Sequence, residues 1–180
     1  MKIYKIGLIG CGRIGTLLEK DKLRGKPCTH AGGFKALSNT KIIAGCDIDH
    51  SRLKNFGRHW GVNRLYKNYR EMLHQEKLDV VCIATWTNLH ASMVIEAARS
   101  GVKAIFCEKP IALNLHDGRQ MVRFCKKRNI PLIINHERRW DSYYLKAKQI
   151  ITTGRIGEVR SIVGNTLSSE PGKHPTRTHG

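Results

Sequence analysis

The chain has 180 residues, 41% of them hydrophobic, and it carries 32 Lys and Arg against 14 Asp and Glu, a formal net charge of +18. This apolar content is enough for a hydrophobic core and excludes disorder as the class. No apolar run approaches the roughly 18 to 20 residues that span a membrane, and Arg13 interrupts the first apolar run too early for a signal peptide. We therefore expect a cytoplasmic protein with no membrane partner.

The basic charge would suit a polyanion as partner. However, the basic clusters are spread over residues 20–26, 119–128 and 138–139. No helix-turn-helix, zinc-finger or aromatic ribonucleoprotein pattern organises them. The sequence therefore favours a solvated basic surface over a specific nucleic-acid partner.

The cysteines indicate a reducing environment. Six Cys are scattered without a C-x-x-C pair, and several lie in apolar runs where Cys behaves as a small hydrophobe. We expect them to be reduced and buried, as in a cytoplasmic protein. No metal site is predicted, because Trp140 stands where a His-Glu-x-x-His zinc motif beginning at His136 needs its second His.

A short apolar run at the amino terminus predicts a buried strand that leads into the turn Gly10-x-Gly12-x-x-Gly15. Apolar residues within 14–18 predict the inward face of a helix directly after the turn. Strand, glycine turn and helix in this order form a dinucleotide-binding fingerprint, in which Gly10 permits the tight turn, Gly12 lets the backbone approach a pyrophosphate and Gly15 lets the helix pack on the strand. The phosphates then bind the unpaired N–H groups of the helix start. The alternative is a purely structural strand-to-helix turn.

The next strand ends in an acidic residue. Residues 21–40 are polar and predict an insertion with a short helical piece near its end. Asp47, at the tip of the strand that follows, is placed to accept hydrogen bonds from the adenosine ribose and to repel the extra phosphate of NADP, which favours NAD. Arg52 nearby leaves NADP open. The alternative is that Asp47 or Asp49 caps the helix predicted over 51–60.

Further strands alternate with helices along the chain. This alternation predicts a doubly wound parallel α/β sheet, whose ligands bind beyond the carboxyl ends of the strands. Thr85–Asn88 and Glu108–Pro110 lie at that edge. The strands are predicted over residues 78–84, 103–107 and 132–135, and the helices over 69–75, 90–100 and 115–128.

Cys107-Glu108-Lys109-Pro110 places a carboxylate and an amine together at the end of a buried strand. A lysine there can polarise a carbonyl or share a proton with a hydroxyl. The alternative is an exposed ion pair in a loop. His136 ends the next strand, where a structural role is favoured over a role as acid or base.

Beyond residue 140 the pattern changes. A helix predicted over 144–153 is followed by an alternating strand over 158–167, and then by a tail over 168–180 that has no large apolar residue and cannot pack by itself. We predict a dinucleotide-binding Rossmann domain over residues 1–140 and the incomplete start of a second domain over residues 141–180.

The chain resembles the glucose-fructose oxidoreductase and inositol dehydrogenase family (Gfo/Idh/MocA) over nearly all of its length. The resemblance implies an enzyme whose amino-terminal domain binds NAD or NADP. Hydride would pass between the nicotinamide and a hydroxyl-bearing carbon, usually of a sugar or cyclitol. The features that carry the resemblance are the glycine turn, Asp47, the turn over 85–90, the specific motif Glu108-Lys109-Pro110 and the strand beginning Gly154-Arg-Ile-Gly-Glu-Val.

The resemblance also implies roles for individual residues. Lys109 resembles the active-site lysine, and Arg139 resembles the arginine that faces the substrate. Trp86 stands where the family commonly has proline, so the resemblance does not fix the fine shape of that turn. The residues that resemble cofactor ligands are Gly10, Gly12, Arg13, Ile14 and Gly15 at the pyrophosphate, Asp47 at the adenosine ribose, Thr85, Asn88 and His90 on the nicotinamide side, and Glu108 at the nicotinamide ribose.

The chain departs from the family in length. Such proteins continue into an open-faced α+β sheet domain that completes the proton relay, contacts the substrate and builds a homo-oligomer, and residues 141–180 resemble only its start. We therefore expect the cofactor-binding portion of an NAD(P)-dependent dehydrogenase, either a fragment or a short protein, that is weakly active or inactive alone. Its full-length form would act on a small sugar or polyol. The alternatives are a non-catalytic dinucleotide-binding module and a basic nucleic-acid-binding protein.

Overall fold

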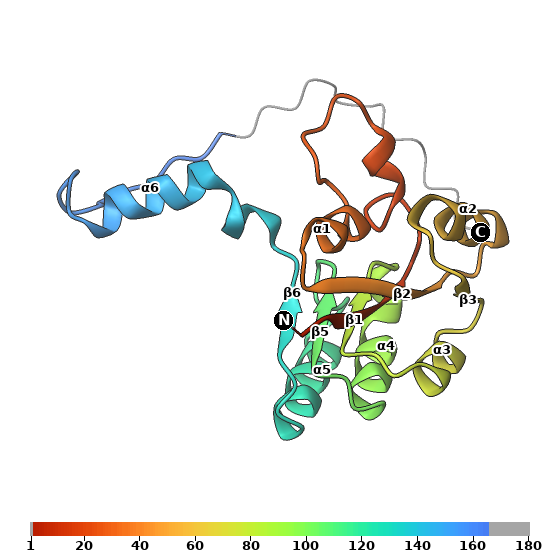
Figure 1. The fold of residues 1–180 in the computed structure, drawn as a ribbon. Helices are drawn as coiled ribbons and strands as arrows, with labels where there is room; N and C mark the ends of the chain where they lie inside the picture. Colours follow the sequence, from red (N-terminus) through yellow and green to blue (C-terminus); the bar gives the residue numbers. More distant parts are fainter. Residues whose placement is uncertain (1, 166–180) are drawn as a thin grey trace. The chain divides into compact units, whose positions relative to one another are not determined.

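In the computed structural model, which describes residues 2–165, six parallel strands form one sheet in the order β3-β2-β1-β4-β5-β6 (Figure 1). β1 pairs with β2 on one side and with β4 on the other, so the strand order reverses between β1 and β4. This is the doubly wound parallel fold that the sequence predicts, and the crevice at the reversal is where such folds bind ligands. The strands are β1 (Tyr4–Ile9), β2 (Thr40–Cys46), β3 (Arg64–Tyr66), β4 (Val80–Ile83), β5 (Ala104–Cys107) and β6 (Leu132–Ile134).

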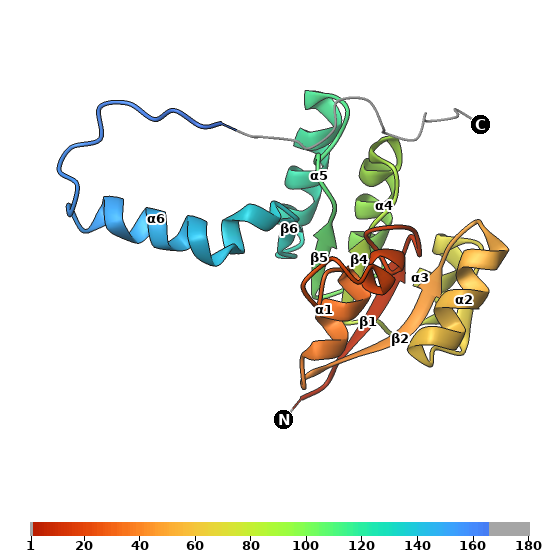
Figure 2. The same ribbon diagram turned by 90° about the horizontal axis from the view of Figure 1, so that it is seen from above.

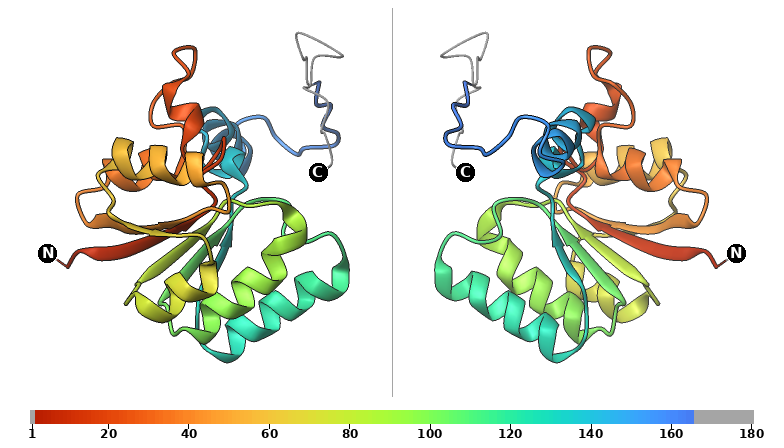
Figure 3. Two further views of the ribbon diagram at one scale, coloured as in Figure 1. Left: turned by 90° about the vertical axis from the view of Figure 1, so that its right-hand side faces the viewer. Right: turned by 90° about the vertical axis from the view of Figure 1, so that its left-hand side faces the viewer.

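Helices cover both faces of the sheet, with α1 and α2 on one face and α3, α4 and α5 on the other (Figure 3). Ile83 and Cys107 are buried with α4 and α5, whereas Cys82 is buried with α1 and α2. This division follows from the pleat, because successive side chains of a strand point to opposite faces. None of the described helices is long and apolar enough to cross a membrane. The helices are α1 (His30–Ala36), α2 (His50–Trp60), α3 (Tyr69–Gln75), α4 (Thr87–Arg99) and α5 (Leu115–Lys127).

The carboxyl ends of the strands lie at one edge because all the strands run parallel, and backbone hydrogen bonds to neighbouring strands hold the first residues after them there. The Gly10 N–H donates to the Cys46 carbonyl at 2.8 Å, and the Glu108 N–H donates to the Ile83 carbonyl at 2.9 Å. Figure 2 shows the sheet from above, with α2 and α3 beside β2 and α5 beside β6. The loops that follow β1, β2, β4 and β5 therefore share one edge of the sheet.

The helix expected directly after the glycine turn is interrupted, and this prediction is wrong. Only a short 3₁₀ turn, η1 (Leu17–Lys20), follows the glycines, and α1 begins after an intervening loop. The first N–H groups of α1, those of His30 and Ala31, donate to the carbonyls of Ile14 and Gly15, each at 3.0 Å. Residues 16–29 are thus an excursion from a helix that resumes where it left the glycine turn. The insertion that the sequence predicts over 21–40 is thus found earlier in the chain, over residues 16–29, and α1 follows it.

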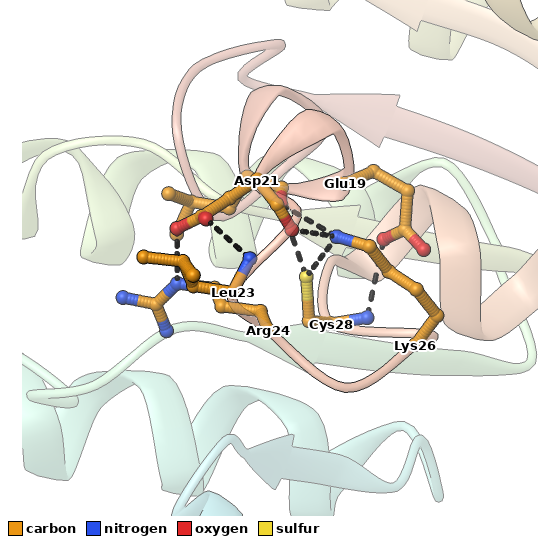
Figure 4. A network of polar contacts seen from close by, with 7 residues as sticks. Glu19, Asp21, Leu23, Arg24, Lys26 and Cys28 are labelled. Atoms are coloured by element: carbon orange, nitrogen blue, oxygen red, sulfur yellow. Dashed lines mark hydrogen bonds and ion pairs between the residues drawn. The ribbon is translucent and has the colours of Figure 1, made fainter.

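The excursion is held closed by its own polar contacts (Figure 4). The Lys26 ammonium donates to two carbonyl oxygens of the preceding turn at 2.8 and 3.1 Å, and it lies 3.3 Å from the Cys28 sulfur. The Glu19 carboxylate accepts the Thr29 hydroxyl at 2.6 Å and the Cys28 N–H at 3.1 Å. Burial raises the pKa of Glu19, but these hydrogen bonds outweigh burial and lower that pKa below its usual value. The loop therefore has a defined shape up to the first residue of α1.

The strand β3 has no counterpart in the sequence prediction. It is three residues long and forms an edge of the sheet, with Arg64 and Leu65 exposed. An exposed strand of this length shows too few residues for an alternating pattern to be recognised. Edge strands are commonly this short.

The chain divides into two compact units, residues 1–136 and 137–180, and the second is described up to residue 165. This second unit contains the 3₁₀ turn η2 (Glu137–Trp140) and α6 (Ser142–Thr152). Of the strand expected over 158–167, residues 158–165 form no strand, and the last two positions lie outside the described residues, as does the tail over 168–180. A strand needs a paired neighbour for its backbone groups, and residues 137–165 contain none. The predicted domain boundary after residue 140 stays a prediction.

Candidate functional site

The fold requires glycine at two of the three glycine positions of the turn. A Cβ on Gly10, whose φ is +95°, would lie 2.5 Å from the Ala84 carbonyl oxygen, and a Cβ on Gly15 would overlap the Gly10 carbonyl oxygen. No side chain fits in either place. A Cβ on Gly12 would meet no protein atom within 4 Å. The fold itself thus does not require glycine at position 12, and the role predicted for Gly12 at a pyrophosphate stays a prediction.

Asp47 binds the glycine turn from the tip of β2. Its side chain is buried, and its two carboxylate oxygens accept the Cys11 N–H at 2.7 Å and the Asp49 N–H at 2.9 Å. The cap of α2 is Asp49, which accepts the Arg52 N–H at 3.0 Å and forms an ion pair with the Arg52 guanidinium at 3.3 Å. Of the two acids weighed as helix caps, Asp49 has that role. Each oxygen of the Asp47 carboxylate keeps a second acceptor position.

His90 connects the loops that follow β4 and β5. Its ring is fully buried, with Nδ1 2.9 Å from the Pro110 carbonyl oxygen and Nε2 3.2 Å from the Thr85 carbonyl oxygen. A neutral imidazole carries one N–H, so it donates to one of these carbonyls at a time. Asn88, on the first turn of α4, is exposed at the same edge. His90 is therefore placed to fix the shape of both loops from beneath the surface.

The Glu108 carboxylate is buried and firmly held. Its Oε1 accepts hydrogen bonds from His30 Nε2 at 2.8 Å and from Asn135 Nδ2 at 2.7 Å, and its Oε2 accepts the Lys109 N–H at 3.1 Å. Burial raises the pKa of Glu108, but the bonds from His30 and Asn135 outweigh burial and lower it. Burial alone would lower the pKa of His30, yet the neighbouring Cys82 sulfur and the Glu108 carboxylate raise it to about 10. The raised pKa of His30 and the lowered pKa of Glu108 both favour an imidazolium beside a carboxylate.

Lys109 extends from the same loop into solvent. Its side chain is exposed, and among residues 2–165 its ammonium forms no hydrogen bond or ion pair. The exposed ion pair considered for Glu108 and Lys109 is thus not formed, because Glu108 is paired with His30 instead. The Lys109 ammonium remains available to a ligand at this edge.

The remaining predicted residues differ in how they are placed. Arg13 is exposed and Ile14 is half-buried in the glycine turn, so both belong to the edge described above. Arg139 is exposed in η2 of the second unit, which is described by itself. The structure therefore brings together the predicted residues of the first unit, whereas Arg139 belongs to the second unit.

Residues 4–136 match the model of the oxidoreductase family with an NAD-binding Rossmann fold, Gfo/Idh/MocA. The chain belongs to this family. Its cofactor class is therefore NAD, as the family description states. A family structure, scyllo-inositol dehydrogenase from Lactobacillus casei with bound NAD(H) and scyllo-inositol, superposes with a TM-score of 0.76 at 25% identity over 87% of this chain and 43% of that one.

Named dehydrogenases are similar in sequence as well. D-apiose dehydrogenase from Paraburkholderia graminis is 36% identical over 157 residues, which are 87% of this chain and 38% of the relative. Myo-inositol 2-dehydrogenase from Thermotoga maritima is 33% identical over 154 residues, which are 86% of this chain and 42% of the relative. The chain thus spans less than half the length of these relatives.

Two residues of this site were not predicted from the sequence. His30 lies in the segment interpreted as an insertion, where nothing in its neighbours indicates a partner, although it binds a residue 78 positions away. Asn135 ends a predicted strand and Glu108 follows another. Because the carboxyl ends of parallel strands meet at one edge, their positions could have indicated that the two side chains lie close together.

Proposed function

We propose that this chain is the cofactor-binding portion of an NAD-dependent oxidoreductase that moves hydride between nicotinamide and a hydroxyl-bearing carbon of a sugar or cyclitol. The observation that supports this most is the convergence of four different loops at one edge of the sheet, where the strand order reverses between β1 and β4. They carry the glycine turn, Asp47, the loop of Thr85 and Asn88, and Glu108 with Lys109. Residues from about 141 onward would begin the domain that contacts substrate.

Each loop has a role in binding the cofactor. The turn over 10–15 would hold the pyrophosphate, with Gly12 giving room for it, and Arg13 and Ile14 would flank it. Asp47 would accept the adenosine ribose hydroxyls on its free acceptor positions. The loop with Thr85 and Asn88, supported by His90, would face the nicotinamide. Glu108 would accept a hydrogen bond from a hydroxyl of the nicotinamide ribose. When bound, the nicotinamide supplies the acceptor or donor of hydride.

The preference for NAD over NADP follows from the charge at Asp47. A carboxylate at the adenosine ribose repels the additional phosphate of NADP. Arg52, the residue that left NADP open, is engaged by Asp49 at 3.3 Å. We therefore propose NAD as the physiological cofactor.

Lys109 would hold or release the proton of the substrate hydroxyl. An amine that is not engaged elsewhere can exchange a proton with an alcohol at the reacting carbon. Hydride transfer also needs the reacting carbons about 3 to 3.5 Å apart. Because most substrate contacts would come from the rest of a longer protein, residues 1–180 alone should show weak turnover or none. Arg139 would face the substrate in that longer form.

The same proposal covers the partners and the compartment. The partner would be a small sugar or polyol, with no specific nucleic acid, and the longer form would be a homo-oligomer. The six cysteines are all free thiols, and five of them are buried, which supports a reducing, cytoplasmic setting.

A titration with NADH and separately with NADPH at physiological salt tests the proposal, with nicotinamide fluorescence as the readout. Saturable binding of NADH that is lost in Gly12→Val supports it, since a valine side chain occupies the space assigned to the pyrophosphate. Equal binding by Gly12→Val, or no binding by a chain whose thermal melting shows it to be folded, contradicts it. Polyanion binding that weakens steeply with salt would favour the nucleic-acid alternative.

A further inference from the structure

The excursion over residues 16–29 brings His30 to Glu108. His30 is the first residue of α1, and its own N–H is bound to the Ile14 carbonyl at 3.0 Å, so its position is fixed relative to the glycine turn. The Glu19 carboxylate holds the hydroxyl of Thr29, the residue just before it, at 2.6 Å. The His30 ring then packs edge-on against Phe106 of β5 at a centroid distance of 5.3 Å. Backbone and ring contacts together point His30 Nε2 at Glu108.

The two carboxylate oxygens of Glu108 accept different numbers of hydrogen bonds. Oε1 has two donors, His30 Nε2 and Asn135 Nδ2, which fill its two acceptor positions. Oε2 has one donor, the Lys109 N–H at 3.1 Å. One acceptor position of the carboxylate is therefore left, and it is on Oε2.

A buried carboxylate needs a positive partner as well as hydrogen bonds. The side chains of His30 and Glu108 are 6% and 8% exposed, and burying an unpaired charge to this degree is costly. Asn135 is neutral and cannot supply the charge. Within residues 2–165, the one cationic group paired with Glu108 is His30.

We propose that His30 is a positioning residue of the cofactor site: it keeps Glu108 ionised and oriented so that Oε2 is the acceptor offered to the nicotinamide ribose. This inference rests on the proposed function, because it assumes that Glu108 faces the cofactor. It gives the excursion over 16–29 a role in the site. His30 acts through Glu108 and does not itself contact cofactor.

The test is a double-mutant cycle on the 180-residue chain. NADH affinity is measured for wild type, His30→Leu, Glu108→Gln and the double variant. ADP serves as a second ligand, since it contains the adenosine and pyrophosphate but no nicotinamide ribose. His74→Gln on α3, an exposed histidine, is the matched control, and thermal melting of every variant reports folding.

We expect His30→Leu to weaken NADH binding roughly tenfold and to leave ADP binding unchanged, as for loss of one hydrogen bond to a charged group. His30→Gln, which keeps an N–H donor near Nε2 but lacks the positive charge, should recover only part of the loss, with an NADH affinity between those of His30→Leu and wild type. In the Glu108→Gln background, His30→Leu should have no further effect, because its effect passes through the carboxylate. His74→Gln should bind both ligands like wild type.

Three results would overturn the inference. NADH affinity of His30→Leu equal to wild type, or an equal loss for NADH and ADP, shows that His30 does not act at the nicotinamide ribose. A full additional loss in the Glu108→Gln background shows that it does not act through Glu108. Absence of NADH binding in wild type overturns the proposed function itself and the inference with it. Should His30→Leu fail to fold, His30→Asn replaces it in the cycle, because the shorter amide does not reach Glu108.

Discussion

His90 Nδ1 lies 2.9 Å from the carbonyl oxygen of Pro110, which joins the first turn of α4 to the loop that carries Glu108 and Lys109. The other ring nitrogen lies 3.2 Å from the Thr85 carbonyl, and the ring is fully buried. One side chain thus sets the separation of the two loops assigned to the nicotinamide side.

Replacing His90 with Leu should therefore affect both stability and cofactor binding. The substitution leaves one of the two carbonyl groups without its donor beside a buried side chain, which costs about 1 to 3 kcal/mol of unfolding free energy. Urea unfolding followed by circular dichroism measures the loss, and an NADH titration should show weaker binding. Replacing the exposed His116 with Leu is the control. Wild-type stability in His90→Leu would mean that these hydrogen bonds contribute nothing.

Replacing Gly15 with Ala should destabilise the protein far more than replacing Gly12 with Ala. A methyl group on Gly15 overlaps the Gly10 carbonyl oxygen, and since that atom is backbone, Gly15→Ala should cost about 3 kcal/mol or more. A methyl group on Gly12 meets no protein atom within 4 Å, so Gly12→Ala should change stability by less than about 0.5 kcal/mol. Thermal melting of the two variants side by side checks this. Similar melting temperatures would show that the turn can relax around Gly15.

The sequence predicts the parts of the fold that depend on short-range patterns. The strand, the glycine turn and the alternation of apolar strands with helices are each visible within a few neighbouring residues, which is why the parallel sheet is predicted correctly. The interruption of the helix after Gly15 is not predicted, because α1 resumes on the carbonyls of Ile14 and Gly15 only after the chain has left and returned. Such a return depends on contacts within the loop, for example those of Glu19 and Lys26.

The candidate site is predictable to the same extent. Asp47 and Glu108 are recognisable because each directly follows an apolar strand. The choice between Asp47 and Asp49 as helix cap cannot be made from two acids two positions apart, and it is decided by which N–H each carboxylate reaches. The partner of Glu108 could not be predicted, since His30 and Glu108 meet only when the excursion and β5 are both in place.

Asp47 and Asp49 should have separable effects. Asp47→Asn keeps one acceptor oxygen and removes the charge, so we expect the preference for NADH over NADPH to fall about tenfold, a change of roughly 1.4 kcal/mol. Asp49→Ala removes the cap of α2 and should cost about 1 kcal/mol of stability without changing that preference. Parallel titrations with the two cofactors distinguish them. A preference that changes in Asp49→Ala and not in Asp47→Asn would reverse the assignment.

The pair of His30 and Glu108 should give the unfolding free energy a characteristic dependence on pH. The pKa of His30 is raised to about 10, above its unfolded value near 6.5, so its contribution is complete below pH 6.5 and is lost as the pH rises toward 10. The pKa of Glu108 is lowered, so its contribution is present above the unfolded value near 4.3 and is lost as the pH falls below it. The pair should therefore stabilise the protein most between about pH 4.3 and 6.5.

Replacing Glu108 with Gln tests this pH dependence of the unfolding free energy. The titratable groups that face His30 are Glu108 and the Cys82 sulfur, and the substitution removes the carboxylate. Between pH 6.5 and 9, urea unfolding of wild type should show a stability that falls with rising pH, since the folded state retains a proton on His30 that the unfolded state has released. Glu108→Gln lacks the carboxylate that holds the proton, so its profile over this interval should be flatter and lie below that of wild type. Parallel profiles for the two proteins would mean that His30 is neutral beside Glu108, and that the bond between them is an uncharged one.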